Sequence, residues 1–484
     1  MPFRAITTAR PWRPCGAGVT FPILLVYRDC RVYRVYRVGK QLGSDPEDAE
    51  DSEGPEDSSW GMLQGSPPTD VSVRDVIPRT IAAVMVFLFL ASPSYAQVTV
   101  AVDVAEDALS WNSQPKLARA PDGSIYLAFV KRAGGVSQIF LARSPDGRTF
   151  RLQQVTREAG DSRFPSLAVG QDGRVHLTWT QYTDPVGKVY YSQLDRGRWS
   201  TPVKLSEGTA YAGVPAVVVD LQQQPHVVWY GIRPNAPPVL TRHGSIYEIL
   251  YRGRSSGRWS ELEFISPGIP DSINPGLAID GRGALHSAWY QSDLRVYHVR
   301  HAQRRTGWEE PQTLTTGGGD AFAVTVAAGS DNGVYVVWER RSTSSTQIYL
   351  SERHARWSGQ QAISSGRTAQ NPSVTVDATG RVYVAWDSEG AIYLRRKNDR
   401  WLGVEQLTRG GKHSHPILST RGPSVDLAWV EDRGTQRLVR FTSLTSAPTR
   451  PSRGLGPILW IGMIAALALI LWQYLRSRRA RAST

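Results

Sequence analysis

Charged, hydroxyl-bearing and amide residues recur at one position of a repeated pattern, just after an aromatic residue that ends a short apolar run. They are Lys131, Gln181, Tyr230, Tyr290, Glu339, Asp387 and Glu431. Arg163 stands near the start of another repeat, where the other repeats carry Asn, Val or Gln, and its guanidinium suits an anionic ligand. Such side chains can bind a carboxylate or move a proton, provided that a scaffold brings the repeated positions together.

Histidines recur as well. His176, His226 and His286 each lie three residues before the aromatic residue of their repeats, inside an apolar run, which predicts hydrogen-bonded core residues. His413 and His415 flank the start of the last repeat, but the sequence offers no third ligand beside them. We therefore predict neither a metal site nor a cofactor.

The scaffold is predicted by the repeat itself. Seven aromatic residues end the second run of each repeat, at Phe129, Trp179, Trp229, Trp289, Trp338, Trp386 and Trp429. The runs alternate apolar and polar residues, as in Val175–Trp179, and Asp-Gly or a related pair joins the first run to the second. Four short strands in each of seven units predict an all-β, seven-bladed β-propeller, with the aromatic residues packed between blades.

Ring closure is predicted from one missing strand and one unassigned strand. The last unit, from Pro416 to Leu444, has three apolar runs and lacks a fourth. The run at residues 98–104 precedes the first unit and has no blade of its own. We therefore expect the N-terminal strand to complete the last blade, which ties the two ends of the propeller together.

Two apolar segments flank the repeats. The first ends in Ser94-Tyr95-Ala96, which predicts a signal peptide at 78–96. The second, residues 455–475, is followed by arginines, which predicts a transmembrane helix with a basic cytoplasmic tail at 476–484. Between them lie the propeller at 97–447 and a Pro-rich stalk at 448–454. A single-pass protein with its propeller outside the cytoplasm is expected.

The first 77 residues show no core pattern and are interpreted as an over-extended gene start or a disordered extension. Both cysteines, Cys15 and Cys30, lie there, so the predicted propeller has no disulfide framework and no thiol nucleophile. The formal net charge of +13 favours anionic polymers, acidic glycans or lipid surfaces as partners. No nucleic-acid-binding motif is present.

Residues 144–150, with the sequence SPDGRTF, resemble the Asp box, or BNR repeat, of the sialidase superfamily. Degenerate copies occur at 192–199 and 257–259. The resemblance implies a turn between the third and fourth strands of a blade, far from the active site. Across the propeller, the sequence is similar to sialidase-like proteins with degenerate repeats.

The resemblance also implies roles for particular residues. Sialidases hold the substrate carboxylate with three arginines and use a Tyr nucleophile, a Glu base and an Asp acid. Arg163 and Asp184 stand where the first arginine and the acid are expected. Tyr230 or Tyr290 would be the nucleophile and Glu339 its base, with Arg340 or Arg341 as further ligands.

Other positions at the starts of repeats and after the aromatic residues are candidates for ligand binding. They are Asn274, Asn371, Asp387, Glu431 and His413, together with Arg163. Both Tyr candidates precede Glu339, whereas the nucleophilic Tyr of sialidases follows the two later arginines. The leading prediction is therefore a membrane-anchored propeller that binds a glycan or another cell-envelope ligand. An exo-acting, sialidase-like glycoside hydrolase and a protein-binding scaffold or assembly factor remain alternatives.

Overall fold

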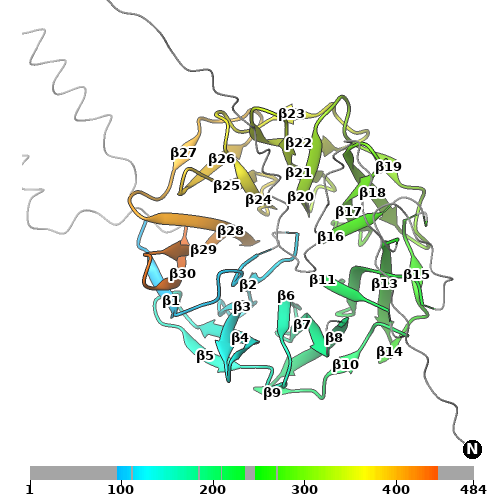
Figure 1. Ribbon diagram of the computed structural model, residues 1–484, viewed down its shortest axis with the longest axis vertical. Helices are drawn as coiled ribbons and strands as arrows, with labels where there is room; N and C mark the ends of the chain where they lie inside the picture. The colour runs from blue at the N-terminus through cyan, green and yellow to red at the C-terminus, as the bar shows by residue number, and fades with distance from the viewer. Residues whose placement is uncertain are drawn as a thin grey trace, which may run out of the picture. The chain divides into compact units, whose positions relative to one another are not determined.

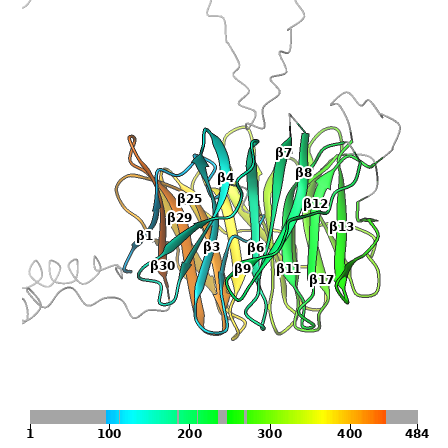
Figure 2. The same ribbon diagram turned by 90° about the horizontal axis from the view of Figure 1, so that it is seen from below.

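The computed structural model describes residues 95–444, except residues 111–112, 184–185, 209, 235–245, 267 and 269–270. In this part of the chain, strands β1 to β30 form seven antiparallel sheets arranged as blades around a central axis (Figure 1; Figure 2). The N-terminal extension, the stalk, the apolar segment at 455–475 and the basic tail lie outside the described residues, as does most of the signal segment. Among the residues described, no helix is long and apolar enough to cross a membrane.

Each blade is a sheet of four main strands that follow one another from the centre of the ring outwards. Blade one is β2 (Leu117–Arg119), β3 (Ile125–Ala133), β4 (Val136–Ser144) and β5 (Arg151–Gln154). Blade two is β6 (Ser162–Val169), β7 (Val175–Thr183), β8 (Val186–Asp195) and β10 (Val203–Lys204), and β9 (Arg198–Trp199) also pairs with β8. Blade three is β11 (Ala212–Val219), β12 (Pro225–Gly231), β13 (Glu248–Ser255) and β14 (Arg258–Trp259), and β15 (Glu263–Phe264) also pairs with β13.

The remaining blades follow in chain order. Blade four is β16 (Ser272–Ile279), β17 (Leu285–Ser292), β18 (Tyr297–Arg304) and β19 (Gln312–Thr313). Blade five is β20 (Asp320–Ala328), β21 (Val334–Arg341), β22 (Thr346–Arg353) and β23 (Gln361–Ala362). Blade six is β24 (Gln370–Val376), β25 (Val382–Ser388), β26 (Ala391–Lys397) and β27 (Glu405–Gln406). Blade seven is β28 (Lys412–Arg421), β29 (Ser424–Asp432), β30 (Arg437–Ser443) and β1 (Val98–Val102).

The recurring aromatic residue of each second strand is core, as the sequence predicts, although every one of these strands continues beyond it. All seven are buried, and each packs against the preceding blade. Trp338, for example, packs with Ala288 and Val299 of blade four. A single sheet would leave these rings in water, so their burial holds neighbouring blades together.

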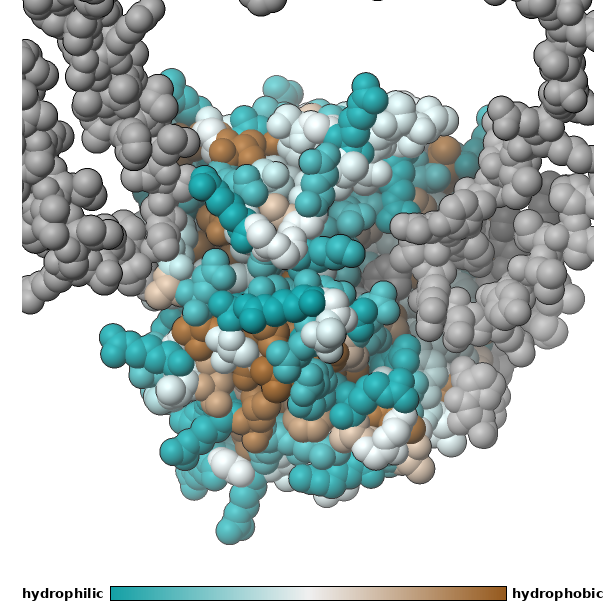
Figure 3. All heavy atoms as spheres, turned by 60° about the vertical axis from the view of Figure 1, so that its left-hand side comes forward, coloured by the Kyte–Doolittle hydropathy of each residue, from teal (hydrophilic) through white to brown (hydrophobic). Residues whose placement is uncertain are grey.

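Closure by the N-terminal strand is confirmed. Strand β1 pairs antiparallel with β30, with Val98 opposite Phe441 and Val102 opposite Leu438 (Figure 1). Val100 is buried in a cluster with residues of blades one and seven. The outer wall on the side of β1 and β30 is largely hydrophilic, with small apolar areas between polar side chains (Figure 3).

The innermost strands of blades two to seven share a β-bulge. At the bulge, one residue has a positive φ of 47–55°; these residues are Phe164, Val214, Asn274, Ala323, Asn371 and His415. Five of the six precede a proline, at the position that opens each repeat in the sequence. The bulge bends the strand, and the backbone N–H groups of Val214, Asn371 and His415 bond outside their own ladders, to side chains of the preceding blade.

A segment of the chain crosses the centre of the ring. Between β1 and β2, the chain runs from the edge of the ring into its centre and returns to blade one (Figure 1). It is anchored by hydrogen bonds between Ala105, Ala108 and Val130. At its far end, the carbonyl oxygen of Ser113 would lie 3.3 Å from a Cβ placed on Gly276, on the inner strand of blade four. The described residues 105–110 and 113–116, which we name the central segment, therefore reach from blade one to blade four.

Candidate functional site

Arg163 lies at the start of β6 and is partly exposed, with 36% of its side chain accessible. Its guanidinium forms ion pairs with Asp161 at 3.3 Å and with Asp107 of the central segment at 3.6 Å. The bulge aligns Asn274 with Phe164 and not with Arg163, so the two candidates occupy different positions of the repeat. A ligand anion at Arg163 would have to compete with two carboxylates.

Tyr290, Glu339 and Arg341 are brought together between blades four and five. Asn274 Nδ2 donates to the Tyr290 hydroxyl at 2.7 Å, and Arg341 pairs with Glu339. The other carboxylate oxygen of Glu339 accepts the N–H of Asn371 at 3.2 Å. Among the described residues, no hydrogen bond joins Tyr290 to Glu339.

The electrostatic environment of Tyr290 opposes ionisation. Burial, and secondly the adjacent Tyr297, raise the pKa of the Tyr290 hydroxyl well above its ordinary value, although Arg341 and Asn274 act in the opposite direction. A nucleophilic Tyr needs a lowered pKa or a base that accepts its proton. Tyr290 has neither in this arrangement.

Asp387 belongs to a chain of contacts between blades. Its carboxylate accepts hydrogen bonds from Asn371 Nδ2 and from the backbone N–H of His415, both at 3.0 Å, and from Gln370 Nε2 at 3.1 Å. Burial raises the pKa of Asp387 to about 7, although these hydrogen bonds lower it. Thr180 and Glu339 accept the bulge N–H of the next blade in the same manner. This repeated contact is structural.

The other predicted residues are also engaged. The hydroxyl of Tyr230 lies 3.3 Å from that of Tyr211 in an aromatic cluster of blade three. His413 accepts from Trp429 Nε1 at 3.1 Å and contacts the Gly410 carbonyl oxygen at 2.6 Å. Glu431 forms ion pairs with Arg433 and Arg440, at 2.8 and 3.3 Å. Asp184 lies outside the described residues.

The recurring histidines are core residues, as predicted. The Nδ1 atoms of His176 and His226 lie 2.8 and 2.7 Å from the hydroxyls of Tyr191 and Tyr251 on the third strand. Burial lowers the pKa of His176 to about 4, so this ring is neutral in the folded protein. In the described part of the chain, no group of three or more His, Cys, Asp or Glu residues could hold a metal ion.

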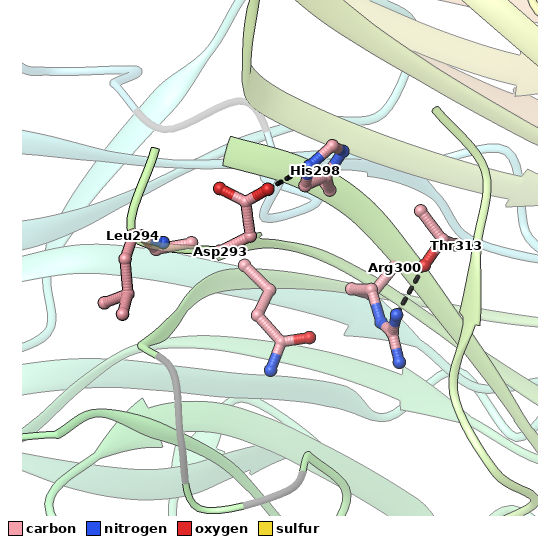
Figure 4. A pocket seen from close by; sticks show the side chains of 7 residues that line it. Asp293, Leu294, His298, Arg300 and Thr313 are labelled. Carbon is pink, nitrogen blue, oxygen red and sulfur yellow. Dashed lines mark hydrogen bonds and ion pairs between the residues drawn. The ribbon is translucent and has the colours of Figure 1, made fainter. Parts of the chain in front are cut away.

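Two features were not predicted from the sequence. Lys116 of the central segment is fully buried, and this burial lowers the pKa of its amine to about 7. A pocket at the edge of blade four is lined by Asp293, His298 and Arg300, among others (Figure 4). Of these residues, only Arg300 could have been noticed in the sequence. It pairs with the core Trp289 on the neighbouring strand, and the residue at this position is aromatic in blades one, two, five and six.

Comparison with known proteins yields fold relatives only. No protein-family model matches the chain, and no curated protein does either. An ulvan lyase structure is 11% identical, with a TM-score of 0.51, over 72% of this chain and 95% of the lyase. A further ulvan lyase structure, bound to -[GlcA(1-4)Rha3S]-, has 10% identity and a TM-score of 0.50, over 72% and 95% of the two chains. A leech intramolecular trans-sialidase has 12% identity and a TM-score of 0.40, over 73% and 68%.

The chain is a seven-bladed β-propeller whose structural neighbours include sialidases and other glycosidase and lyase propellers. At these identities the likeness concerns the fold. Because propellers with this fold host different activities, the activity has to be argued from the side chains.

Proposed function

We propose that this protein is a membrane-anchored propeller that binds an acidic glycan outside the cytoplasm without cleaving it. The single observation that carries the choice of binding over cleavage is the closed Tyr290–Glu339 group. The hydroxyl of Tyr290 is bonded to Asn274 and its pKa is raised, while Glu339 is bonded to Arg341 and Asn371. A sialidase-like mechanism needs the opposite arrangement, with the Tyr hydroxyl bonded to the carboxylate.

The arginines near the predicted site support the same proposal. Of the candidate arginines, Arg163 and Arg341 pair with carboxylates of the protein itself, whereas Arg340 donates to the Gly318 carbonyl oxygen at 3.1 Å. A set of three arginines converging on a substrate carboxylate would need guanidinium groups that are free of such partners. The candidate hydrolytic site therefore has the right residue types in an arrangement that stabilises the fold.

An acidic glycan is favoured by charge and by chemistry. The chain carries a formal net charge of +13, which attracts polyanions. The ulvan lyase with a similar fold is bound to a polymer repeat that contains GlcA. The proposed location rests on the apolar segments at 78–96 and 455–475 and on the arginines after the second of them.

The test combines binding and turnover on the full-length protein in mild detergent. We expect carboxylate-bearing glycans on a glycan array to be retained and a fluorogenic sialoside to stay intact. Tyr290→Phe should leave both results unchanged, because this hydroxyl takes part in no reaction. Release of the fluorophore that is lost in Tyr290→Phe or Asp184→Ala would instead establish a glycosidase.

A further inference from the structure

A pocket of about 350 Å³ opens at the edge of blade four, beside the turn between β17 and β18 (Figure 4). Its lining includes Gln291, Asp293, Leu294, His298, Arg300 and Thr313. Gln291 pairs with Ser272 at the start of β16, so the pocket lies at the end of the sheet where the blade starts. Successive residues of a strand face opposite sides of the sheet, so Gln291 points away from the Tyr290–Glu339 group. We name this pocket the rim pocket.

The rim pocket occurs where blade four departs from the repeat. In blades two, five and six, the residue opposite the core Trp is a Tyr whose ring stacks on that Trp, with centroids 6.0–6.2 Å apart. In blade four, the residue opposite Trp289 is Arg300. The guanidinium reaches the outer strand, where it donates to the hydroxyl of Thr313 and to the Pro311 carbonyl oxygen at 2.9 Å. An aromatic ring is thus replaced by a fixed cation.

Within the described part of the chain, the charge of Glu310 acts on Arg300, but no carboxylate contacts its guanidinium. No ion pair of the described residues includes Arg300, and its buried Nε has no hydrogen-bond partner there. In blade seven, the equivalent arginine, Arg440, pairs with Glu431. Burial lowers the pKa of Arg300 even though Glu310 raises it, so this cation is not fully compensated, and an anion in the pocket would be stabilised.

The opposite side of the pocket is rigid and polar. Asp293 Oδ1 accepts the backbone N–H groups of Arg295 and Val296, both at 2.8 Å, and Oδ2 lies 3.0 Å from His298 Nε2. These backbone hydrogen bonds lower the pKa of Asp293 to about 2, so it stays ionised. Leu294, with a φ of 73°, is exposed on this turn and gives the mouth an apolar surface.

We propose that the rim pocket binds one carboxylate-bearing sugar unit of an acidic glycan. The Arg300 guanidinium pairs with the sugar carboxylate. Asp293 and Thr313 accept hydrogen bonds from ring hydroxyls, and Leu294 packs against an apolar face of the ring. The volume lies at the lower end of ligand pockets, roughly 300–1,000 Å³, which suits one or two sugar rings. This inference rests on the proposed function and gives it a ligand class and a site.

The test uses trigalacturonic acid as the probe and its methyl ester as the neutral control, titrated calorimetrically into the full-length protein at low ionic strength. We expect the acid to bind at least about tenfold more tightly than the ester. Arg300→Tyr restores the residue found in three other blades, so the blade should keep its stability while affinity falls at least about tenfold.

A matched pair at the mouth separates charge from shape. Leu294→Asp adds a negative charge beside the ligand carboxylate, whereas Leu294→Asn has nearly the same size without the charge. Both residues tolerate a positive φ, so neither should disturb the turn. We expect Leu294→Asp to bind at least about tenfold more weakly than Leu294→Asn. Arg295→Gln, which removes one exposed charge outside the pocket lining, should keep the affinity of the parent.

Other results would contradict the site, the recognition of the carboxylate or the proposed function. If the probe binds but Arg300→Tyr and Leu294→Asp bind it as tightly as the parent, the rim pocket is not the site. If only Arg163→Ala then loses affinity, the ligand binds beside Arg163, and the proposed function of glycan binding still holds. If the acid and its ester bind equally, the carboxylate is not recognised. If the protein retains no glycan on the array, the proposed function fails, and this inference fails with it.

Discussion

At the scale of single residues, the buried Asp387 makes the stability of the fold depend on pH. Burial raises the pKa of its carboxyl to about 7 in the folded protein, whereas an unfolded Asp titrates near 4. Between these values the folded state binds more protons than the unfolded state. The unfolding free energy contributed by this group therefore falls as pH rises from about 4 to 7 and stays low above that.

Asp387→Asn should remove this pH dependence, because the amide does not ionise. We expect the variant to gain stability relative to the parent by on the order of 2 kcal/mol between pH 5 and pH 8, measured by urea unfolding. Asp146→Asn is the matched control. The pKa of Asp146 is lowered, chiefly by the backbone N–H of Arg148, so its effect should be the same at both pH values. Parallel curves for Asp387→Asn and the parent would contradict the prediction.

At the scale of elements, β1 decides whether blade seven is complete. Val100 is 5% exposed and packs with residues of blades one and seven, whereas Val102 on the same strand is 40% exposed. Val100→Asp should lower the unfolding free energy by about 3–5 kcal/mol, because it buries a charge and removes core contacts. Val102→Asp should cost less than about 1 kcal/mol.

Thermal unfolding followed by circular dichroism would measure both variants. The two variants share the strand, the substitution and the added charge. The difference between their melting temperatures therefore reports whether the side chain at position 100 is buried in the core. If the two variants melt together, β1 does not close the ring in solution. The pairing predicted from the missing strand and the unassigned strand would then contribute no stability.

The elements were predictable because each depends on local patterns that the chain repeats seven times. Alternation over runs such as 175–179 fixes which side chains are buried, and the Asp-Gly pairs fix the turns. The bulge on the inner strands was not predicted, because it is a departure from alternation that the residue before a proline only hints at. The bulge matters for the candidate site, because the bulge N–H groups donate hydrogen bonds to the side chains of Thr180, Glu339 and Asp387. Two of the predicted site residues are thereby engaged in contacts between blades.

At the scale of the whole molecule, several of the residues predicted to form the site are not accessible to a ligand. Tyr290, Glu339 and Asp387 are buried. The sequence could not show this, because the partners lie on other strands of the same blade or on the neighbouring blade, as Asn274 does for Tyr290 and Asn371 for Glu339. The rim pocket could not be predicted either, because its residues meet through contacts between strands. Only Arg300 had a signal in the sequence.

The central segment ties opposite sides of the ring together, and Lys116 at its end allows this arrangement to be tested. The side chain is fully buried, and burial lowers the pKa of its amine to about 7. An unfolded Lys titrates near 10.4. Between these values the unfolded state binds more protons, so the contribution of Lys116 to stability rises with pH from 7 to about 10.

Lys116→Met replaces the amine with an apolar chain of similar length and should remove this rise. We expect the variant to be more stable than the parent by on the order of 2 kcal/mol at pH 7, with the gain shrinking towards pH 9.5, in urea unfolding followed by Trp fluorescence. Lys131→Met, at the top of β3 where the amine bonds to the Val102 carbonyl oxygen, controls for the loss of one positive charge. If the two variants respond to pH alike, the Lys116 amine is hydrated in the folded protein.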